Sequence, residues 1–478
     1  MNSFNNIKGA ALFSNWKFMG VFFLVMVSLA VLVSKSGIVV SLLVLAIPLV
    51  VSYLWIVFAN PRFGFILLLC YNFIAIGLTR YLPGIPFGLG VDFQMIVIYV
   101  SLVYNTFFHK VQWKEALTNL FLLFVIWYAY SLFQLFNPQA VSKIAWFYAM
   151  RGVSMYMLLT IPLVFIVFNK KNDLSVFLKI WAVFAILLAV KGILQKFIGP
   201  DPWEQAWLNA GGELTHVLFG KLRVFSFLSD AGQFGGAQGH SAIVFLILAY
   251  HEKNDKKLRF LYFVTGVLSL YGMMISGTRG SIAVPVAGFA LYVLLSRRFK
   301  LVIMGVFAIV AMFVFFRFTT IGNSNYTIYR MRSAFNFNDP SLQVRLENQR
   351  KLRTYMANKP FGGGIGSAGN WGMRFSPNTF LAQTPTDSWY VMIWAEQGIV
   401  GLLLHLAILF YIVIRSSYVI MYKLKDPDNI SRMSALLSGV WGVMVASYAN
   451  GILGQMPTGI IIYSSMAYLF LAEKQDSE

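Results

Sequence analysis

The sequence is dominated by a succession of apolar runs, each about long enough to cross a lipid bilayer. A helix crosses the hydrocarbon core with roughly 20 apolar residues. Hydrophobic residues make up 58% and charged residues 12% of the chain, whereas a soluble domain carries about 25% charged residues. Backbone polar groups inside lipid must be hydrogen-bonded within their own segment, so such runs fold as helices. We therefore expect an all-α polytopic membrane protein.

We predict about fourteen transmembrane helices within a single integral-membrane domain, residues 1–478. Their expected starts are Phe18, Val39, Gly64, Val91, Leu117, Tyr148, Val176, Ser241, Phe260, Ile282, Leu301, Gly398, Ala435 and Gly459. No small-residue cleavage site follows the first run, so we interpret it as a helix and not as a signal peptide. The single cysteine, Cys70, cannot form an internal disulfide.

Four short connections between the predicted helices are basic, and they indicate the orientation of the chain. They are residues 169–173, 251–259, 296–300 and 422–432. Alternating helices place all four on one side, and short basic loops face the cytoplasm. An even number of helices then places both termini in the cytoplasm. The net charge of +20 agrees with this bias and with attraction to anionic membrane lipid.

Two long segments are then predicted to face outward, residues 199–240 and 317–387, and both are expected to contain short helices. Residues 341–358 have the composition of a helix that ends before a Lys-Pro pair and a glycine cluster. Residues 317–386 carry nine Lys and Arg residues against two acidic residues. One interpretation is a solvated helix face near anionic lipid. The other is a binding site for a phosphate-bearing ligand.

The stretch `SGTRGS` places Arg279 between Gly277 and Gly280, in the connection between two predicted helices. The glycines allow a tight turn and the close approach of another group. Taken alone, Arg279 is explained by a side chain that extends to the membrane interface. Its neighbours in the other outward segments favour a ligand-binding role instead.

The first outward segment ends in `KLRVFSFLSDAGQFGGAQGHSAI`, which contributes Arg223 and a polar cluster next to an apolar run. The cluster is Ser229, Asp230, Gln233, Gln238 and His240. Polar groups at membrane depth are costly unless they line a cavity. His240 is therefore a candidate substrate-binding residue, and the alternative is a structured loop with capping residues.

The second outward segment ends in `KPFGGGIGSAGNWG` followed by `TPTDSWYVMIWAEQGIVGLLL`. Its glycines, with Gly363 and Gly364 as candidate binding residues, indicate backbone close to another chain or to a ligand. The Gly-Lys-Ser/Thr ending of a phosphate-binding P-loop is missing. Asp387 precedes the next apolar run, with Glu396 nine residues further on. Asp387 is a candidate catalytic group, and a helix N-cap is its alternative role.

These segments, far apart in sequence, bring several arginines and a carboxylate to one membrane face. They are Arg223, Arg279, Arg345, Arg350, Arg353 and Asp387. Guanidinium groups stabilise the charge that develops on a phosphate leaving group, and an acceptor hydroxyl needs a carboxylate or histidine as base. A glycosyl donor on a polyprenyl pyrophosphate fits this chemistry. No dense Asp, Glu and His cluster indicates a divalent metal, so we expect no metal and no cofactor.

Over roughly residues 223–404 the sequence resembles the bacterial O-antigen ligase/polymerase superfamily. The resemblance rests on `SGTRGS`, the Arg223 loop, `RLENQRKLRTYMANKPFGGGIG` and `DSWYVMIWAEQGIVGLL`. It implies a metal-independent GT-C type glycosyltransferase of the bacterial inner membrane, with its active site facing the periplasm. The implied donor is an undecaprenyl-pyrophosphate-linked glycan, which Arg223 and Arg279 hold by its pyrophosphate. Arg345 matches the arginine that opens the periplasmic helix of the family.

One position departs from the family pattern. Ligases carry His-Asn before the helix with Glu-Xaa-Gly, and these positions are Asp387 and Ser388 here. We therefore predict a polymerase that joins lipid-linked repeat units of a surface polysaccharide, with an O-antigen ligase as the alternative. The expected partners are a glycan or lipid-linked acceptor, membrane lipid and other polysaccharide-assembly proteins, but no nucleic acid. A transporter is the weaker hypothesis, since the charges gather at one membrane face and no repeat is evident.

Overall fold

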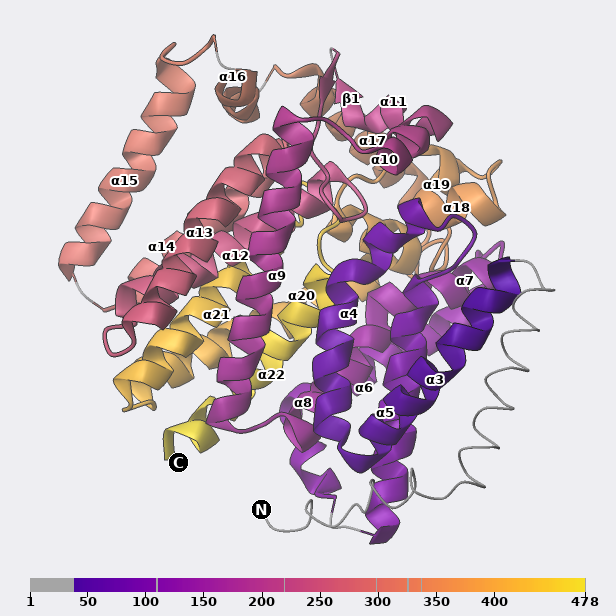
Figure 1. Cartoon of the computed structure of the whole chain (residues 1–478). Helices are drawn as coiled ribbons and strands as arrows, with labels where there is room; N and C mark the ends of the chain where they lie inside the picture. Colours follow the sequence, from indigo (N-terminus) through magenta and orange to yellow (C-terminus); the bar gives the residue numbers. More distant parts are fainter. Residues whose placement is uncertain are drawn as a thin grey trace.

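The computed structural model of the chain describes residues 38–108, 111–218, 220–297, 299–324, 326–336 and 338–477. The predicted helix that begins near Phe18 lies outside these residues. The long helices form one bundle (Figure 1). They are α3 (Ile38–Ala59), α4 (Pro61–Tyr81), α5 (Gly88–Phe108), α6 (Asn119–Phe133), α7 (Lys143–Met150) continuing into α8 (Tyr156–Val167), α9 (Lys171–Phe197), α12 (Ala231–His251), α13 (Lys256–Ile275), α14 (Ala283–Leu295), α15 (Phe299–Phe318), α20 (Trp389–Tyr422), α21 (Pro427–Ala446) and α22 (Thr458–Ser477).

Short irregular helices continue or connect several of these. Three are of the 3-10 type, namely η1 (Trp113–Ala116), η2 (Gln134–Phe136) and η5 (Arg279–Ile282), and η3 (Arg151–Met155) is a π-helix that joins α7 to α8. Every predicted helix start from Val39 onward lies within one of the described helices or at most two residues before it.

The described helices have the length and surface of a membrane protein. Seven of them are long and apolar enough to cross a bilayer. Large apolar side chains are exposed on the outside of the bundle, among them Trp55, Phe107 and Phe307. A water-facing surface rarely carries so much apolar area. The prediction of an all-α polytopic membrane protein is confirmed, and the total of about fourteen helices stays a prediction.

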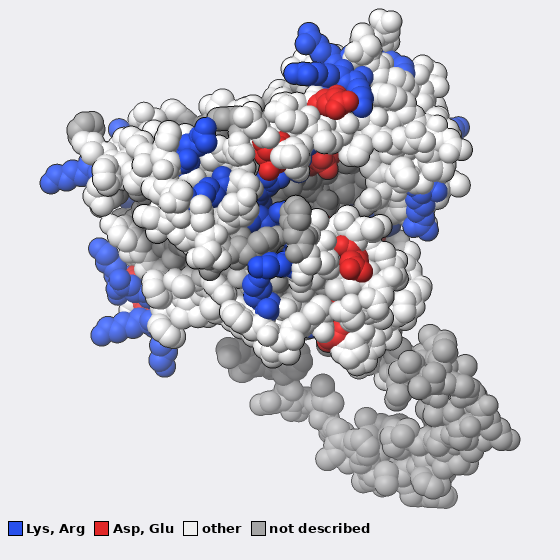
Figure 2. Space-filling view, turned by 90° about the horizontal axis from the view of Figure 1, so that it is seen from above, with Lys and Arg blue, Asp and Glu red and all other residues white. Residues whose placement is uncertain are grey.

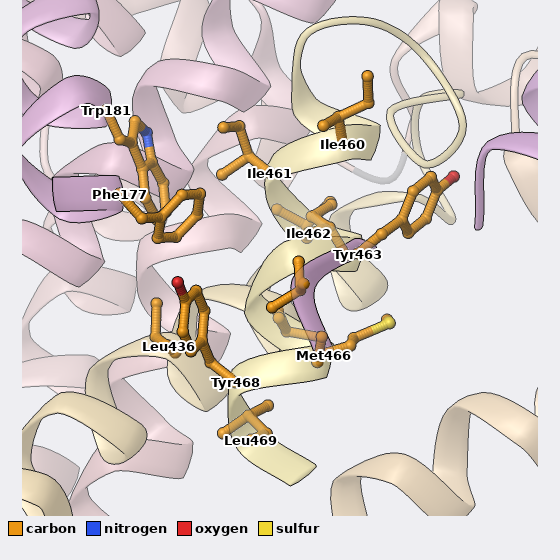
Figure 3. Packing of buried hydrophobic residues seen from close by; sticks show 14 of the residues in the cluster. Phe177, Trp181, Leu436, Ile460, Ile461, Ile462, Tyr463, Met466, Tyr468 and Leu469 are labelled. Carbon is orange, nitrogen blue, oxygen red and sulfur yellow. The ribbon is translucent and has the colours of Figure 1, made fainter. Parts of the chain in front are cut away.

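Helix α22 runs through the interior of the bundle. Ile460, Ile461 and Ile462 are buried on successive sides of the helix. Tyr468 packs against Phe177 of α9, with their ring centroids 5.6 Å apart (Figure 3). A helix that is apolar all round must be covered on all sides, and here α8, α9, α20 and α21 are among the helices in contact with it.

The basic connections meet at the lower end of the bundle in Figure 1, where the chain also reaches its C-terminus. Lys171 Nζ lies 3.3 Å from Asp426 Oδ2 of another connection. Arg297 Nη1 donates to the carbonyl oxygen of Met421 near the end of α20 (2.8 Å), and His251 Nε2 lies 2.7 Å from Tyr292 Oη near the end of α14. The contacts therefore place these connections on one face, as alternating helices require.

The long connections form the upper end of the bundle in Figure 1. Their elements are α10 (Pro202–Trp207), η4 (Leu208–Gly212), α11 (Glu213–His216), β1 (Val217–Leu218), β2 (Lys221–Leu222), α16 (Tyr326–Arg332), η6 (Ser333–Phe335), α17 (Pro340–Met356), α18 (Gly369–Phe375) and α19 (Phe380–Gln383). The strands pair antiparallel, with Val217 opposite Leu222. The helix predicted over 341–358 is confirmed as α17. Figure 2 looks onto this end, which carries charged side chains of both signs.

Candidate functional site

A groove of about 540 Å³ opens beside Arg279 at the upper end of the bundle. Its charged lining consists of Arg279, in the turn between α13 and α14, and of Asp339, Arg345 and Asp387 from the second long connection. Its apolar lining includes Ile282 of η5, Val286 of α14, and Ile309, Met312 and Phe313 of α15. We call this cavity the Arg279 groove. A ligand that fills it meets charge at one part and hydrocarbon at another.

Arg279 reaches the groove because the chain turns sharply after α13. Gly277 has φ +63°, a conformation that favours glycine. Arg279 Nη1 then donates to Asp339 Oδ2 at 2.5 Å and to Ser333 Oγ at 3.0 Å. Burial alone would raise the pKa of Asp339, but the hydrogen bond and positive charge of Arg279 and two backbone N–H groups lower it. Arg279 is thus held by a carboxylate that remains ionised.

Arg223 and Arg330 hold the turn that precedes Arg279. Arg223 Nη2 donates to Thr278 Oγ1 at 3.1 Å, and Arg330 Nε donates to the carbonyl oxygen of Gly277 at 2.7 Å. Neither side chain lines the Arg279 groove. Sequence reasoning counted Arg330 only as part of a basic segment, and no motif distinguished it from the other arginines there.

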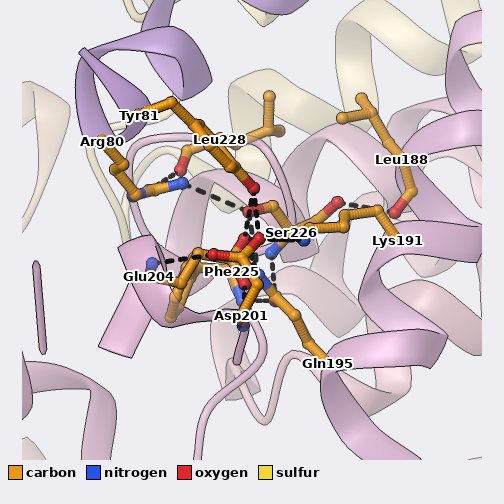
Figure 4. A network of polar contacts seen from close by, with 10 residues as sticks. All are labelled: Arg80, Tyr81, Leu188, Lys191, Gln195, Asp201, Glu204, Phe225, Ser226 and Leu228. Carbon is orange, nitrogen blue, oxygen red and sulfur yellow. Dashed lines mark hydrogen bonds and ion pairs between the residues drawn. The ribbon is translucent and has the colours of Figure 1, made fainter. Parts of the chain in front are cut away.

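A polar network under the first long connection fixes the segment that carries Arg223. Arg80 of α4 donates to the carbonyl oxygens of Ser226 and Leu228, and its guanidinium lies over the rings of Trp207 and Phe225. Figure 4 shows Arg80 at the upper left of this network, next to Leu228.

The same network joins α9 to α10. Lys191 Nζ lies 2.8 Å from Asp201 Oδ2 and 3.1 Å from Glu204 Oε1, while Gln195 of α9 donates to Glu204 at 2.8 Å (Figure 4). Because Glu204 is fully buried, its charge requires these donors. The first long connection is therefore rigidly attached to α4 and α9.

Asp387 lies opposite Arg345, with Oδ2 at 3.3 Å from Arg345 Nε. Its φ of +52° is in the left-handed region, which is uncommon for a residue with a side chain. Residues held in this region often belong to functional sites. Asp387 is not the N-cap of α20, because Ser388 fills that role by accepting the backbone N–H of Val391. The capping alternative for Asp387 is therefore wrong.

A second and larger cavity, about 830 Å³ in volume, lies on the other side of Asp387. We call it the Trp371 cavity. Its lining includes Tyr148, Arg151, Asp230, Trp371 and Arg374. Residues 386–388 line both cavities. Asp387 therefore belongs to the wall that separates them.

Several residues predicted for the site lie elsewhere. Arg350 and Arg353 are exposed on α17 and line neither cavity. His240 is buried in α12 with its ring centroid 4.6 Å from that of Trp181, and it also lies outside both cavities. These three residues therefore do not line the Arg279 groove, which Arg279 and Asp387 both line.

The predicted glycines Gly363 and Gly364 approach another part of the chain. Their N–H groups donate to the carbonyl oxygens of Ala395 and Glu396 at 2.9 and 2.8 Å. Helix α20 is interrupted at Gly398, where φ is +69°, and a Cβ there would collide with the backbone of Pro360. This segment therefore packs backbone against backbone.

Glu396 lines the Trp371 cavity but is itself almost fully buried. Its Oε1 accepts the N–H of Ala368 at 3.2 Å, at the start of the segment that leads into α18. The carboxylate therefore fixes the position of α18 relative to α20, next to the cavity.

The comparison with known families agrees with this geometry. Residues 264–406 match the model of the family described as O-antigen ligase. This part of the chain is similar to the family of O-antigen ligases. The resemblance to the O-antigen ligase/polymerase superfamily is therefore confirmed. A search of curated proteins gave no match.

The matched region extends from the middle of α13 to the middle of α20. It contains Arg279, Asp339, Arg345 and Asp387, which together form the charged lining of the Arg279 groove. Arg223 and His240 precede it. The family match supports a ligase- or polymerase-type enzyme that is integral to the membrane.

Asp339→Asn separates the charge of Asp339 from its structural role. Asparagine caps helix α17 as well as aspartate does, but it removes the ion pair with Arg279. We expect the free energy of unfolding to fall by roughly 1–3 kcal/mol at pH 7. Because the folded pKa of Asp339 is lowered, the pair stabilises the fold above about pH 3.9 and loses this effect as the pH falls through the folded pKa.

Thermal unfolding in detergent, measured over a pH series, checks this prediction. The difference between wild type and Asp339→Asn should shrink below about pH 4. Glu347→Gln is the control, since Glu347 forms an exposed pair with Lys351 on the same helix and should change little. A difference that stays constant down to acid pH would contradict the ion-pair explanation.

Proposed function

We propose that the protein is a glycosyltransferase that polymerises undecaprenyl-pyrophosphate-linked repeat units into a surface polysaccharide. The observation that carries the proposal is the Arg279 groove, in which two arginines and two carboxylates lie next to an apolar lining that includes residues of two membrane helices. A polyprenyl pyrophosphate has the same division, with a charged head group at the interface and a hydrocarbon chain below it.

This division supports a position for the donor. Ile309, Met312 and Phe313 of α15 would contact the polyprenyl chain, and Arg279 and Arg345 would contact the pyrophosphate. A guanidinium group presents a planar fork of N–H donors that matches phosphate oxygens. Asp339 then acts as the stand-in anion, holding Arg279 in position until the pyrophosphate arrives.

The transfer breaks one bond and forms another. The oxygen of an acceptor hydroxyl bonds to the anomeric carbon of the donor sugar, and the bond from that carbon to the pyrophosphate oxygen breaks. The hydroxyl proton passes to the carboxylate of Asp387. Negative charge develops on undecaprenyl pyrophosphate, where fixed guanidinium groups stabilise it without a metal.

Arg223 and Arg330 support this chemistry from behind the turn. They bind Thr278 and Gly277, the two residues before Arg279, and so they position its side chain. Their positive charges also strengthen the potential felt by an anionic head group. Arg350 and Arg353, exposed on the same helix as Arg345, would contribute only to this wider field.

The orientation follows from the two ends of the bundle. The lower end holds the short basic connections, which favours the cytoplasm, so the Arg279 groove would face the periplasm. With about fourteen helices, both termini would be cytoplasmic. The arrangement is then that of a GT-C type enzyme, a single domain over residues 1–478 with two long periplasmic loops at 199–240 and 317–387.

An O-antigen ligase is the second candidate, and the description of the matching family favours it. In that case the same donor would be transferred to lipid A-core or another acceptor. We favour the polymerase because ligases resembling this chain carry histidine at the position of Asp387. The donor chemistry at Arg279 is the same for both, so the two candidates differ only in acceptor.

Arg279→Ala should lower the rate of glycan transfer at least about a hundredfold, since it removes a guanidinium group that donates hydrogen bonds to the leaving group. Arg279→Lys should also be poor, because an ammonium group does not replace the guanidinium fork. Transfer is measured with purified protein in nanodiscs. Lys351→Ala, an exposed cation on α17, is the control and should keep normal activity. Normal transfer by Arg279→Ala would overturn the proposal.

Asp387→Asn should lower the transfer rate by about a hundredfold or more, because an amide cannot accept the proton. Stability should change little, since asparagine tolerates the left-handed conformation and Ser388 caps the helix. The rate and the thermal midpoint are measured on the same preparation. Equal fractional losses of both would show that Asp387 is structural.

Deletion of the gene separates polymerase from ligase. Loss of a polymerase leaves single repeat units on the final lipid, because ligation continues without chain growth. Loss of a ligase leaves long chains on the undecaprenyl carrier. Gel analysis of the surface glycans, together with extraction of the carrier lipid, distinguishes the outcomes. We expect the first pattern, and the second would replace the polymerase by the ligase.

A further inference from the structure

The Trp371 cavity is not required by the donor, and its lining is different from that of the Arg279 groove. Its volume of about 830 Å³ is in the range of small-molecule sites. Tyr148 of α7 and Trp371 of α18 line it with nearly parallel rings, whose centroids are 5.0 Å apart and whose planes differ by 20°. Phe375 extends the stack, 5.6 Å from Tyr148. This side of the cavity is therefore aromatic, with the Arg374 guanidinium carbon 5.8 Å from the ring centroid of Tyr148 and 5.9 Å from that of Trp371.

Other parts of the lining are polar. Asp230 at the start of α12 accepts Ser229 Oγ and the N–H of Gln233, and its two carboxylate oxygens have capacity for further donors. Arg151 lies 3.0 Å from Asp92 and adds N–H donors to the lining. Gln455, from the connection between α21 and α22, also lines the cavity.

This combination matches the chemistry of a sugar ring. A pyranose has a face of C–H groups, which packs on aromatic rings, and a rim of hydroxyls, which both donate and accept hydrogen bonds. A lipid tail would offer no hydrogen bonds to the Asp230 carboxylate and the Arg151 guanidinium, which line the cavity, and would exclude water from them. Asp230, Asp387 and Glu396 outnumber Arg151 and Arg374 in the lining, so a phosphate is less favoured here than in the Arg279 groove, where the two kinds of group are equal in number.

The position of the cavity suggests which sugar it holds. Thr386, Asp387 and Ser388 line it together with the Arg279 groove. A sugar in the Trp371 cavity therefore reaches Asp387 from a different cavity than the donor pyrophosphate, so that the acceptor and the leaving group need not occupy the same space. The glycan of the donor itself would instead extend from the anomeric carbon on the groove side.

We propose that the Trp371 cavity binds the acceptor glycan, with a sugar ring stacked on Trp371 and Tyr148 and its reacting hydroxyl beside Asp387. The inference rests on the proposed function, because only a transferase with its donor in the Arg279 groove makes the occupant of this cavity an acceptor.

Binding of a lipid-free glycan tests the proposal. The full-length protein in nanodiscs is titrated with repeat-unit oligosaccharide released from the host cell's own surface polysaccharide, and binding is followed by calorimetry. Trp371→Ala should weaken binding about tenfold, whereas Trp371→Phe should keep most of it. Trp203→Ala, an exposed tryptophan on α10 that lines neither cavity, should bind normally. Unchanged binding by Trp371→Ala overturns the inference.

Binding of undecaprenyl pyrophosphate, measured on the same variants, tests the donor site in the Arg279 groove independently of the acceptor site in the Trp371 cavity. Arg279→Ala should no longer bind undecaprenyl pyrophosphate but should still bind the oligosaccharide. Trp371→Ala should still bind undecaprenyl pyrophosphate but should bind the oligosaccharide weakly. If Arg279→Ala keeps the pyrophosphate, the donor assignment fails, whatever happens at Trp371.

Transfer kinetics distinguish whether the sugar ring in the Trp371 cavity belongs to the acceptor glycan or to the glycan of the donor. In transfer assays, Trp371→Ala should raise the KM for the acceptor with the KM for the donor unchanged. A raised KM for the donor that depends on the length of its glycan would assign the cavity to the donor chain and overturn the proposal.

Discussion

The hydrogen bond between Arg279 and Asp339 organises the upper end of the bundle. It joins the turn between α13 and α14 to the first residue before α17, and both side chains are mostly buried, with 18% and 15% of their area exposed. Arg345 follows Asp339 by six residues, a rise of about 9 Å along the helix. The direction in which α17 leaves Asp339 therefore decides whether Arg345 reaches Asp387. Two catalytic candidates on different segments are positioned through one ion pair.

The sequence predicted the helices well, because a bilayer imposes a length and a composition that short apolar runs cannot imitate. It also predicted one site with Arg279, Arg345 and Asp387, which line the Arg279 groove, and with Arg223, Arg350 and Arg353, which do not. It did not predict Asp339 as the partner of Arg279, because sixty residues separate them and only the folded connection brings them together. Arg330, Trp371 and Tyr148 were not singled out for the same reason. Each lies in a segment whose path depends on its neighbours.

The glycine cluster indicated a close approach of backbone, but the sequence did not show what approaches it. Gly363 and Gly364 were expected to approach another chain segment or a ligand, and they pair with the backbone of α20. Gly398, on the other side of this contact, interrupts α20. Glu396 lies between these features and fixes the entry to α18. The glycines thus shape the Trp371 cavity indirectly, by setting how closely α18 and α20 approach.

The burial of α22 has a consequence for how the molecule is assembled. This helix follows all the other described helices in the chain, yet Phe177, Trp181 and Leu436 contact it in the interior of the bundle (Figure 3). During synthesis, α9 and α21 enter the membrane before residues 458–477 exist. The earlier helices must therefore leave a slot, filled by lipid or closed by looser packing, until α22 arrives. The interior around α22 is therefore completed only after α9 and α21 have entered the membrane.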